Sequence, residues 1–356
     1  MGTDDGGLAE AHPVTLNYED LCNPECDLNS KIAEAYGAQG LGILTVRGVP
    51  GLAQLRNQLL PLAACFAALP AEVRTLYEDP ASSYNFGWSQ GKEMLEGGQP
   101  DTNKGSYYAN PALDWPTDDP QLLTEYPAYC RPNIWPHDHL PELKAAFKAL
   151  GQLIMRVGLL LTQHCDKYVA AQGARLPISL YDILQQSPCP KGRLLHYYPP
   201  TGASSSSADD GAGPNWCGWH TDHGSLTGLT SAMFLSENLH PVGCPDPQAG
   251  LYIRTRQGQR VRVALPEDHL GYQMGEAMQI HSGGVLLATP HCVVAPRPSL
   301  SHGISRNTLA VFMQPRWDCP MAAPAGVDPA QIGVGQWVPG ISFGEFSRRT
   351  FDKYYT

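Results

Sequence analysis

A histidine and an aspartate two residues apart, His220 and Asp222, precede an apolar stretch in the C-terminal half of the chain. On an extended segment, side chains two residues apart point to the same face. One imidazole and one carboxylate on one face supply two ligands of a two-histidine, one-carboxylate site, which leaves open coordination positions on a metal such as Fe(II). An isolated His-x-Asp also occurs in surface turns. Whether this one binds a metal therefore depends on the other ligands that the chain supplies.

A metal site of this kind needs a second histidine, and several lie in the same half of the chain. His291 stands at the start of an expected strand, after the run 283–288, and could reach the mouth of a barrel. A histidine on a strand is otherwise usually a satisfied core or rim residue. His302, eleven residues further on, is a rival for the same role.

An arginine and a threonine, Arg306 and Thr308, lie where a further apolar strand begins and alternate onto one of its faces. A guanidinium aimed into an apolar barrel needs an anionic partner, because an unpaired buried charge is very costly. The carboxylate of a co-substrate would meet this need, with the Thr308 hydroxyl as a second donor. A structural ion pair with an Asp or Glu of the chain is the alternative.

The elements that must position these residues differ between the two halves of the chain. Helical spacing and capping residues predict helices over 27–35, 52–69 and 141–171, with a strand over 42–46. The apolar stripe of the longest helix indicates that it braces a sheet. The C-terminal half predicts short strands separated by turn residues, over 193–198, 226–234, 250–254, 260–265, 284–288, 291–295 and 308–314. Such strands without intervening helices predict a sandwich or jelly-roll barrel.

The segment from 84 to 115 has no periodicity and is rich in aromatic residues. Long aperiodic segments in compact domains are often functional, and aromatic side chains can wall a pocket. We predict that aromatic side chains from this segment, with one at a strand end, shield the metal site and favour a planar or apolar small substrate. They are Tyr84, Phe86, Trp88, Tyr107, Tyr108 and Phe312. A packed surface loop is the alternative.

Composition narrows the class of protein. The formal net charge of -10 argues against nucleic acid or an anionic membrane as the main partner. No apolar run approaches the roughly 20 residues of a membrane span, and residues 1–7 lack the apolar core of a signal peptide. The ten cysteines are scattered, which favours reduced thiols in a cytoplasmic protein. A small-molecule substrate and a monomer are expected.

Four short pieces follow one another in a recognisable order. They are His196-Tyr197-Tyr198-Pro199-Pro200, His220-Thr221-Asp222, Ser282-Gly283-Gly284 leading to His291, and Arg306-Asn307-Thr308. In this order the chain resembles the isopenicillin N synthase-like family of Fe(II)- and 2-oxoglutarate-dependent dioxygenases, best known from plants. Two stretches, 42–49 and 69–72, are similar to the family's N-terminal region, so the resemblance covers the chain from about residue 14 onward.

The resemblance implies an α+β fold, with a double-stranded β-helix (jelly-roll) core and the long helix packed outside it. It implies that the Fe(II) ligands are His220, Asp222 and His291. It also implies that three residues hold the distal carboxylate of 2-oxoglutarate, namely Tyr198, Arg306 and Thr308. The oxidant would be O2, with ascorbate in a supporting role.

The chain also departs from the family. It has His196 where Asn is usual, Arg47-Gly48 where Asn-His-Gly is usual, and Thr308 in place of Ser. The interval before Arg306 is longer than usual, which is why His302 stays a rival. We favour His291, because its glycine-rich lead-in sits at the family's distance and His302 lies too near Arg306 to occupy a separate strand.

These observations predict a disordered tail over 1–13, a helical support region with the aromatic segment over 14–185, the jelly-roll core over 186–320 and a C-terminal extension over 321–356. The function expected is oxidation of a small organic substrate with release of succinate and CO2. An iron oxidase that uses no 2-oxoglutarate would keep the same triad. A zinc hydrolase would have no obvious need for Arg306 and Thr308, and a non-catalytic jelly-roll binding module would need neither metal nor arginine.

Overall fold

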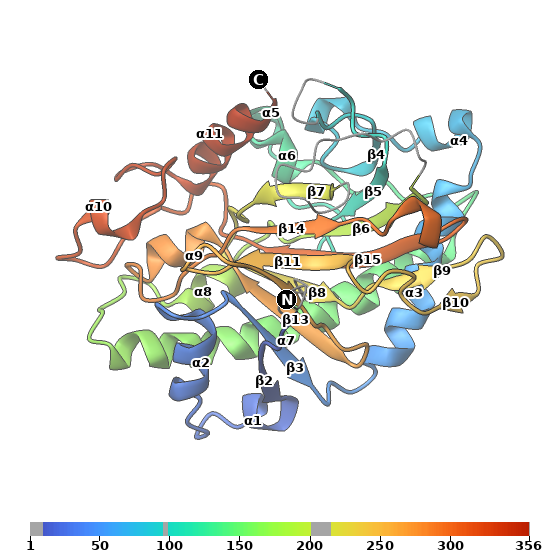
Figure 1. Ribbon diagram of the computed structural model, residues 1–356. Coiled ribbons are helices and arrows are strands. Elements are labelled where there is room, and N and C mark those ends of the chain that lie inside the picture. The colour runs from blue at the N-terminus through green and yellow to red at the C-terminus, as the bar shows by residue number, and fades with distance from the viewer. Residues whose placement is uncertain (1–9, 95–98, 201–214, 356) are drawn as a thin grey trace, which may run out of the picture.

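The computed structural model describes residues 10–94, 99–200 and 215–355, whose strands form two sheets (Figure 1). The larger sheet has, in spatial order, β2 (Val14–Asn17), β3 (Ile43–Arg47), β13 (His269–Met274), β8 (Leu226–Thr230), β15 (Ser305–Met313), β6 (Lys191–Tyr197), β5 (Lys104–Ala109) and β4 (Gly87–Gln90). At its margin β9 (Met233–Leu235) pairs with β15 and β10 (Pro241–Val242). The smaller sheet has β1 (Glu10–Ala11), β12 (Arg260–Val263), β11 (Gly250–Arg254), β14 (His291–Val294) and β7 (Asn215–His220).

The inner faces of the two sheets meet in apolar clusters that close the jelly roll. In one cluster Leu195 and Ala310 of the larger sheet pack with Trp216 and Val293 of the smaller sheet. In another, Ile43 of β3 packs with residues of β11 and β12. Strand alternation places these residues on the buried inner faces. The predicted α+β fold with a jelly-roll core is therefore confirmed.

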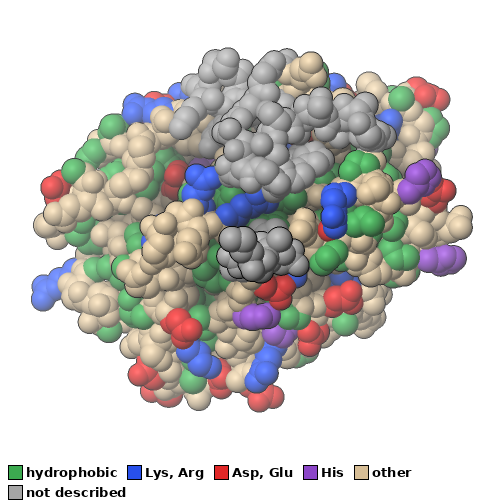
Figure 2. Space-filling model, in the orientation of Figure 1, with side chains coloured by type: hydrophobic (Ala, Val, Ile, Leu, Met, Phe, Trp, Pro, Cys, Tyr) green, Lys and Arg blue, Asp and Glu red, His purple; other side chains and the backbone are tan. Residues whose placement is uncertain are grey.

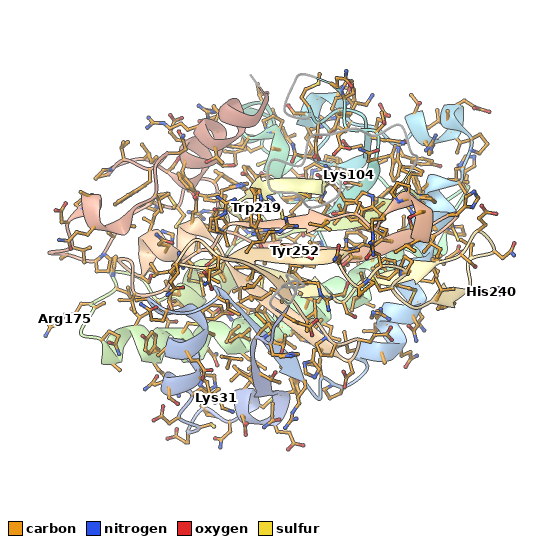
Figure 3. All side chains as sticks on the ribbon, in the orientation of Figure 1. Lys31, Lys104, Arg175, Trp219, His240 and Tyr252 are labelled. Atoms are coloured by element: carbon orange, nitrogen blue, oxygen red, sulfur yellow. The ribbon has the colours of Figure 1, made fainter. Side chains whose placement is uncertain are left out.

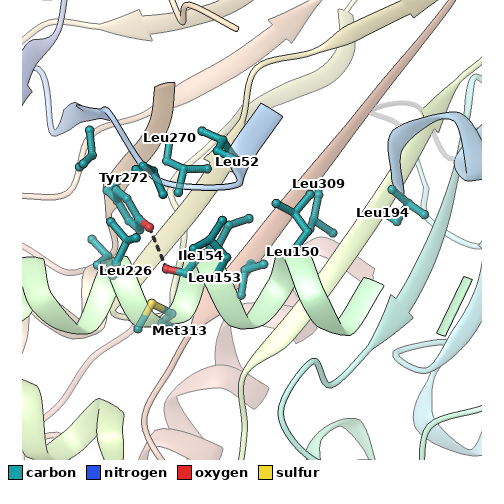
Figure 4. Packing of buried hydrophobic residues seen from close by; sticks show 14 of the residues in the cluster. Leu52, Leu150, Leu153, Ile154, Leu194, Leu226, Leu270, Tyr272, Leu309 and Met313 are labelled. Carbon is teal, nitrogen blue, oxygen red and sulfur yellow. Dashed lines mark hydrogen bonds between the residues drawn. The ribbon is translucent and has the colours of Figure 1, made fainter. Parts of the chain in front are cut away.

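Two long helices cover the outer face of the larger sheet, α3 (Leu52–Ala67) and α7 (Glu142–Ala171). Figure 4 shows α7 lying across the strands, with the hydroxyl of Tyr272 donating to the backbone oxygen of Ile154 at 2.7 Å. By length and composition alone α7 could cross a membrane. Its apolar face, however, is buried on the sheet, which is the bracing role that its sequence predicts.

A glycine of the sheet, Gly228, allows α7 to pack closely against it. A methyl group added to Gly228 of β8 would lie 2.1 Å from Cγ2 of Ile154. Overpacking of this kind typically costs about 1–3 kcal/mol. We expect Gly228→Ala to lower the free energy of unfolding by that amount in denaturant titrations. Gly335→Ala is the matched control, since nothing lies within 4 Å of the added methyl group, and it should leave stability nearly unchanged.

Short helices fill the connections. They are α1 (Tyr18–Cys22), α2 (Asn29–Tyr36), α4 (Ala71–Thr75), α5 (Pro120–Glu125), α6 (Pro127–Cys130), α8 (Leu180–Gln185), α9 (Glu276–His281) and α10 (Pro329–Ile332), together with single 3-10 turns at Pro80–Ser82 and Pro298–Leu300. The last helix is α11 (Phe343–Tyr355). Phe343 and Phe346 of α11 are buried in a second apolar cluster with Ile280 of α9.

The structure corrects three expectations about the elements. The segment from 84 to 115 contains β4 and β5, which extend the larger sheet. No strand forms over 284–288, where the chain turns after α9 with Gly283 and Gly284 at φ of +67° and +81°. Within the expected tail, Glu10–Ala11 forms β1 and pairs with β12, whereas residues 1–9 lie outside the described part.

Candidate functional site

Two strands of the smaller sheet bring together the two histidines that the sequence singles out. His220 ends β7, His291 begins β14, and the two residues pair directly across the sheet. Asp222 follows β7 in a loop, and its Oδ1 lies 3.8 Å from Nε2 of each histidine. One ligand atom from each of the three residues lies within 4.8 Å of the others. A single divalent cation between them could therefore contact all three.

Hydrogen bonds fix the direction in which each histidine presents its free nitrogen. Nδ1 of His220 donates to the Gly218 carbonyl at 2.8 Å, which leaves Nε2 to face Asp222. Nδ1 of His291 lies 3.3 Å from the Thr289 carbonyl, so this atom also carries its proton. The side-chain amide of Gln273 contacts the same atom through Nε2 at 2.6 Å. Turning this amide over would place Oε1, which has no partner among the described residues, there as a second acceptor. Such outer partners orient metal-binding imidazoles.

The Asp222 carboxylate is also oriented by a hydrogen bond. Oδ2 of Asp222 accepts a 2.6 Å hydrogen bond from the Thr227 hydroxyl, which leaves Oδ1 facing the histidines. Burial opposes ionisation, but His291, His220 and the hydroxyl hold the pKa of Asp222 below its ordinary value. Burial lowers the pKa of His291 to about 4, so this imidazole is neutral at pH 7. Neutral imidazole and ionised carboxylate are the forms that bind metals.

His220 differs from His291 in its charge state. Burial opposes its protonation, but Cys217 and Asp222 raise the pKa of His220 to about 9. A cation that binds at neutral pH must therefore displace a proton from Nε2 of His220. Metal binding to such a site releases protons and strengthens as the pH rises.

His302 does not join this group. It is exposed in a turn after Pro298–Leu300, whereas His291 is buried beside Asp222. Of the two rivals for the third position, the structure brings only His291 within reach of His220 and Asp222.

Arg306 lies in the interior between the sheets, on the face of β15 that the sequence predicts. Its side chain is buried, and its Nε and Nη1 have no hydrogen-bond partner among the described residues. No carboxylate of the described chain pairs with it, and burial lowers its pKa. Because an unpaired buried guanidinium is costly, these two donors indicate a place for an anionic ligand. A carboxylate of 2-oxoglutarate fits this donor set.

The tyrosine beside Arg306 is Tyr197, and this corrects the expectation for Tyr198. Tyr197 pairs with Arg306 across β6 and β15, and the guanidinium carbon lies 4.9 Å from the centre of its ring. Tyr198 comes one residue later, and its hydroxyl accepts from Arg74 at 3.1 Å. Neighbouring residues on a strand point to opposite faces, so a one-residue difference decides which tyrosine enters the interior.

Thr308 shares the inner face with Arg306, as predicted, but its hydroxyl has a partner within the chain. It donates to the Thr230 carbonyl at 3.0 Å. The donors that an anion in the interior would meet are therefore chiefly Arg306 and Tyr197, because the Thr308 hydroxyl is already engaged.

The six aromatic residues predicted to line a substrate pocket divide into two groups. Trp88 and Tyr107 face the outer side of the larger sheet and pack on Phe66 of α3, with ring centres 5.0 and 4.9 Å apart from it, so they belong to the core. Phe86 is also fully buried, beneath the ammonium of Lys191. The expectation is therefore wrong for Trp88 and Tyr107. For Phe86 it stays a prediction, because Lys191 pairs with Phe312 and so lies on the inner face of the sheet.

The other three aromatic residues lie apart from this outer core. Phe312 is half-buried in the interior cluster on β15. Tyr84 and Tyr108 line a cavity of about 230 Å³ between the loop at 80–85 and strands β4 and β5. The substrate wall stays a prediction for these three residues.

Comparisons with known proteins agree with this arrangement. No protein-family model and no curated protein matches the chain. Among solved structures, a full-length Neurospora crassa protein in complex with alpha-KG (2-oxoglutarate) and thymine is 20% identical, with a TM-score of 0.68 over 99% of both chains. A 2OG-Fe(II) oxygenase family protein of Caulobacter crescentus is 19% identical, with a TM-score of 0.68 over 97% of this chain and 99% of that one.

JOX2, crystallised with 2OG, Fe and JA, is 16% identical, with a TM-score of 0.63 over 99% of this chain and 88% of that one. Identities this low establish a shared fold. The chain therefore has the fold of the 2OG-Fe(II) oxygenases along almost its whole length.

Two supporting residues carried no signal in the sequence. Gln273 lies on β13, and Thr227 lies on β8, next to His291 and Asp222 respectively. Both strands are central in the larger sheet, where burial on both faces removes the alternation that reveals which side chains point inward. Tyr197 could have been found only from the strand register.

Proposed function

We propose that the protein is an Fe(II)- and 2-oxoglutarate-dependent oxygenase that oxidises a small organic molecule. The observation that supports this best is the combination of two features in one interior. A buried His220–Asp222–His291 group can hold a divalent cation, and Arg306 offers two donors, unpartnered among the described residues, to an anion. When bound, Fe(II) and 2-oxoglutarate supply the oxidation, in which O2 and 2-oxoglutarate are consumed, succinate and CO2 are released and the substrate is oxidised.

The chain itself contributes three things to such a reaction. His220, Asp222 and His291 would hold the cation through one ligand atom each and leave further coordination positions for other ligands. Arg306 and Tyr197 fix one end of the co-substrate and set its direction toward the triad. The surrounding apolar cluster, which includes Phe312 and Val293, excludes water from the space between them.

The ordered motifs and this donor set together support the finer assignment to the isopenicillin N synthase-like group. Arg306 also separates the proposal from a zinc hydrolase, which needs no anion site of this kind. An iron oxidase without 2-oxoglutarate would use the same triad. For such an enzyme Arg306 would have to receive a carboxylate of the substrate instead.

Binding in the absence of oxygen tests the proposal directly. The purified protein should bind one Fe(II), and 2-oxoglutarate should bind only weakly until iron is present. Calorimetry with Fe(II), with 2-oxoglutarate and with both distinguishes these states. Equal affinity for 2-oxoglutarate with and without iron would contradict a shared site.

The two adjacent tyrosines give a matched pair of variants. Tyr197→Phe removes a hydroxyl beside Arg306, and a lost hydrogen bond to a charged group costs about 1.5–3 kcal/mol, or roughly ten- to hundredfold in affinity. We expect this weakening of 2-oxoglutarate for Tyr197→Phe and little change for Tyr198→Phe. Weaker binding in Tyr198→Phe and unchanged binding in Tyr197→Phe would make Tyr198 the co-substrate residue. That result would contradict the pairing of Tyr197 with Arg306 between β6 and β15.

A further inference from the structure

The hairpin of β11 and β12 in the smaller sheet carries a concentration of positive charge that the metal and co-substrate sites do not use. Residues 254–262 contain four arginines and no Asp or Glu. The whole chain has a formal net charge of -10, so this stretch is opposite in sign to the rest of the protein. A local excess of one charge attracts ligands of the opposite charge.

Strand alternation places the arginines of this hairpin on the outer face of the smaller sheet. Ile253 and Val261 pack in one of the interior clusters. Arg254 and Arg260 follow and precede them in the sequence and pair directly with each other across the two strands, so they share the opposite face. His291 pairs with Ile253 and lies on the inner side. The smaller sheet therefore separates Arg260 from the proposed metal site.

Two aromatic rings support guanidinium groups on this outer face. The guanidinium carbon of Arg260 lies 4.2 Å from the centre of the Tyr252 ring, and that of Arg254 lies 4.7 Å from the centre of the Trp219 ring. Figure 3 labels both aromatic residues, Tyr252 on β11 and Trp219 on β7. Stacking on a ring orients a guanidinium and leaves its N–H donors pointing sideways, in the plane of the group.

Arg260 differs from its neighbour Arg262 in lacking a partner. Arg262 forms an ion pair with Glu10, whereas Nε and Nη2 of Arg260 are shielded from water and make no hydrogen bond to any described residue. These two atoms form one edge of the guanidinium, so a single ligand can accept from both. Such an edge matches two oxygens of a carboxylate or phosphate group. An unpaired guanidinium with shielded donors is costly, which indicates that an anion belongs there.

We propose that Arg260 anchors a second binding site, on the outer face of the smaller sheet, for the phosphate group of a small soluble ligand. Two phosphate oxygens accept from Nε and Nη2 of Arg260. The combined field of the four arginines favours a doubly charged phosphate over a singly charged carboxylate. Because the sheet lies between this site and the triad, the ligand is bound there without being oxidised, and the site is independent of the proposed oxygenase function.

Calorimetry with inorganic phosphate and with phenyl phosphate tests this site. Titrations in a phosphate-free buffer, at an ionic strength held constant with sodium chloride, remove the general effect of salt. Acetate is the singly charged comparison. We expect inorganic phosphate to bind at one site and acetate to bind more weakly. Binding of phenyl phosphate as well would identify phosphate esters as ligands, whereas binding of inorganic phosphate alone would identify the free ion.

Arg260→Gln should weaken phosphate roughly tenfold or more, the effect of losing a hydrogen bond to a charged group. Arg260→Lys keeps the charge but loses the edge of two donors, so it should also bind more weakly than the wild type. Arg175→Gln is the matched control, since Arg175 is exposed at the edge of the molecule (Figure 3), and it should bind phosphate like the wild type. Circular dichroism establishes that each variant keeps its fold.

Thermal unfolding gives a second measurement of the same site. A ligand that binds only the folded protein raises its melting temperature. Phosphate should therefore raise the melting temperature of the wild type and of Arg175→Gln, and should have a much smaller effect on Arg260→Gln at the same concentration.

Arg306 also offers two donors that have no partner among the described residues, so Arg306→Lys is titrated beside the Arg260 variants. Phosphate binding should survive Arg306→Lys. The proposal would be overturned if neither phosphate compound bound the wild type, if acetate bound as tightly as phosphate, or if Arg260→Gln bound phosphate like the wild type. Loss of phosphate binding in Arg306→Lys but not in Arg260→Gln would place the anion in the co-substrate site instead.

Discussion

Asp222→Ala is expected to abolish both Fe(II) binding and turnover. The carboxylate faces two imidazoles at 3.8 Å, and two histidines alone rarely hold a labile divalent ion. Loss of an outer partner alone typically costs about 10- to 100-fold in metal affinity, so loss of a ligand should exceed roughly 100-fold. Metal analysis after gel filtration, with anaerobic titration of Fe(II), measures the effect.

His220→Ala should behave like Asp222→Ala. His302→Ala is the matched control, because His302 is exposed and outside the group, and it should bind iron like the wild type. Circular dichroism of each variant establishes that the fold is kept. If His302→Ala lost iron while His291→Ala kept it, the third ligand would be wrongly assigned.

Changes at Arg306 should affect the co-substrate and spare the metal. Arg306→Lys keeps the charge but loses the planar fork, and should weaken 2-oxoglutarate roughly ten- to hundredfold. Thr308→Val should have a smaller effect, because its hydroxyl already donates to the Thr230 carbonyl. Calorimetry on the iron-loaded protein separates the two variants. Equal losses for both would show that Thr308 binds the co-substrate directly.

The residues that carry chemistry could be predicted from the sequence, since their types and order are distinctive. His220, Asp222 and His291 meet as expected, and Arg306 enters the same interior. Tyr197 could not be chosen over Tyr198, because sequence spacing does not set the register of β6 against β15. A shift of one residue exchanges the two faces of a strand.

The aromatic segment over 84–115 shows a second limit of prediction from sequence. β4 and β5 are covered by helices on one face and by the barrel interior on the other, so Trp88 and Tyr107 occupy the outer core while Tyr108 turns inward. Burial on both faces erases the period-two pattern that marks a strand. The pattern of a short apolar run does not by itself determine its secondary structure. For this reason the sequence predicts a strand over 284–288, although the segment forms a turn.

Among the described residues, His220, Asp222 and His291 are the one group of His, Cys, Asp or Glu side chains placed to hold a metal ion. Arginines on the smaller sheet stack on aromatic rings, Arg254 on Trp219 and Arg260 on Tyr252. Figure 2 shows basic side chains gathered near the centre of this face, beside the atoms drawn in grey. The residues proposed to bind the metal and the co-substrate lie instead in the interior between the sheets.

Release of succinate from 2-oxoglutarate tests the central claim most directly. The wild-type protein with Fe(II), ascorbate, O2 and a bound substrate should convert 2-oxoglutarate to succinate in step with substrate oxidation. Asp222→Ala should release none, and Arg306→Lys should need a much higher 2-oxoglutarate concentration. Substrate oxidation by the wild type without consumption of 2-oxoglutarate would contradict the account, and would assign Arg306 to a carboxylate of the substrate.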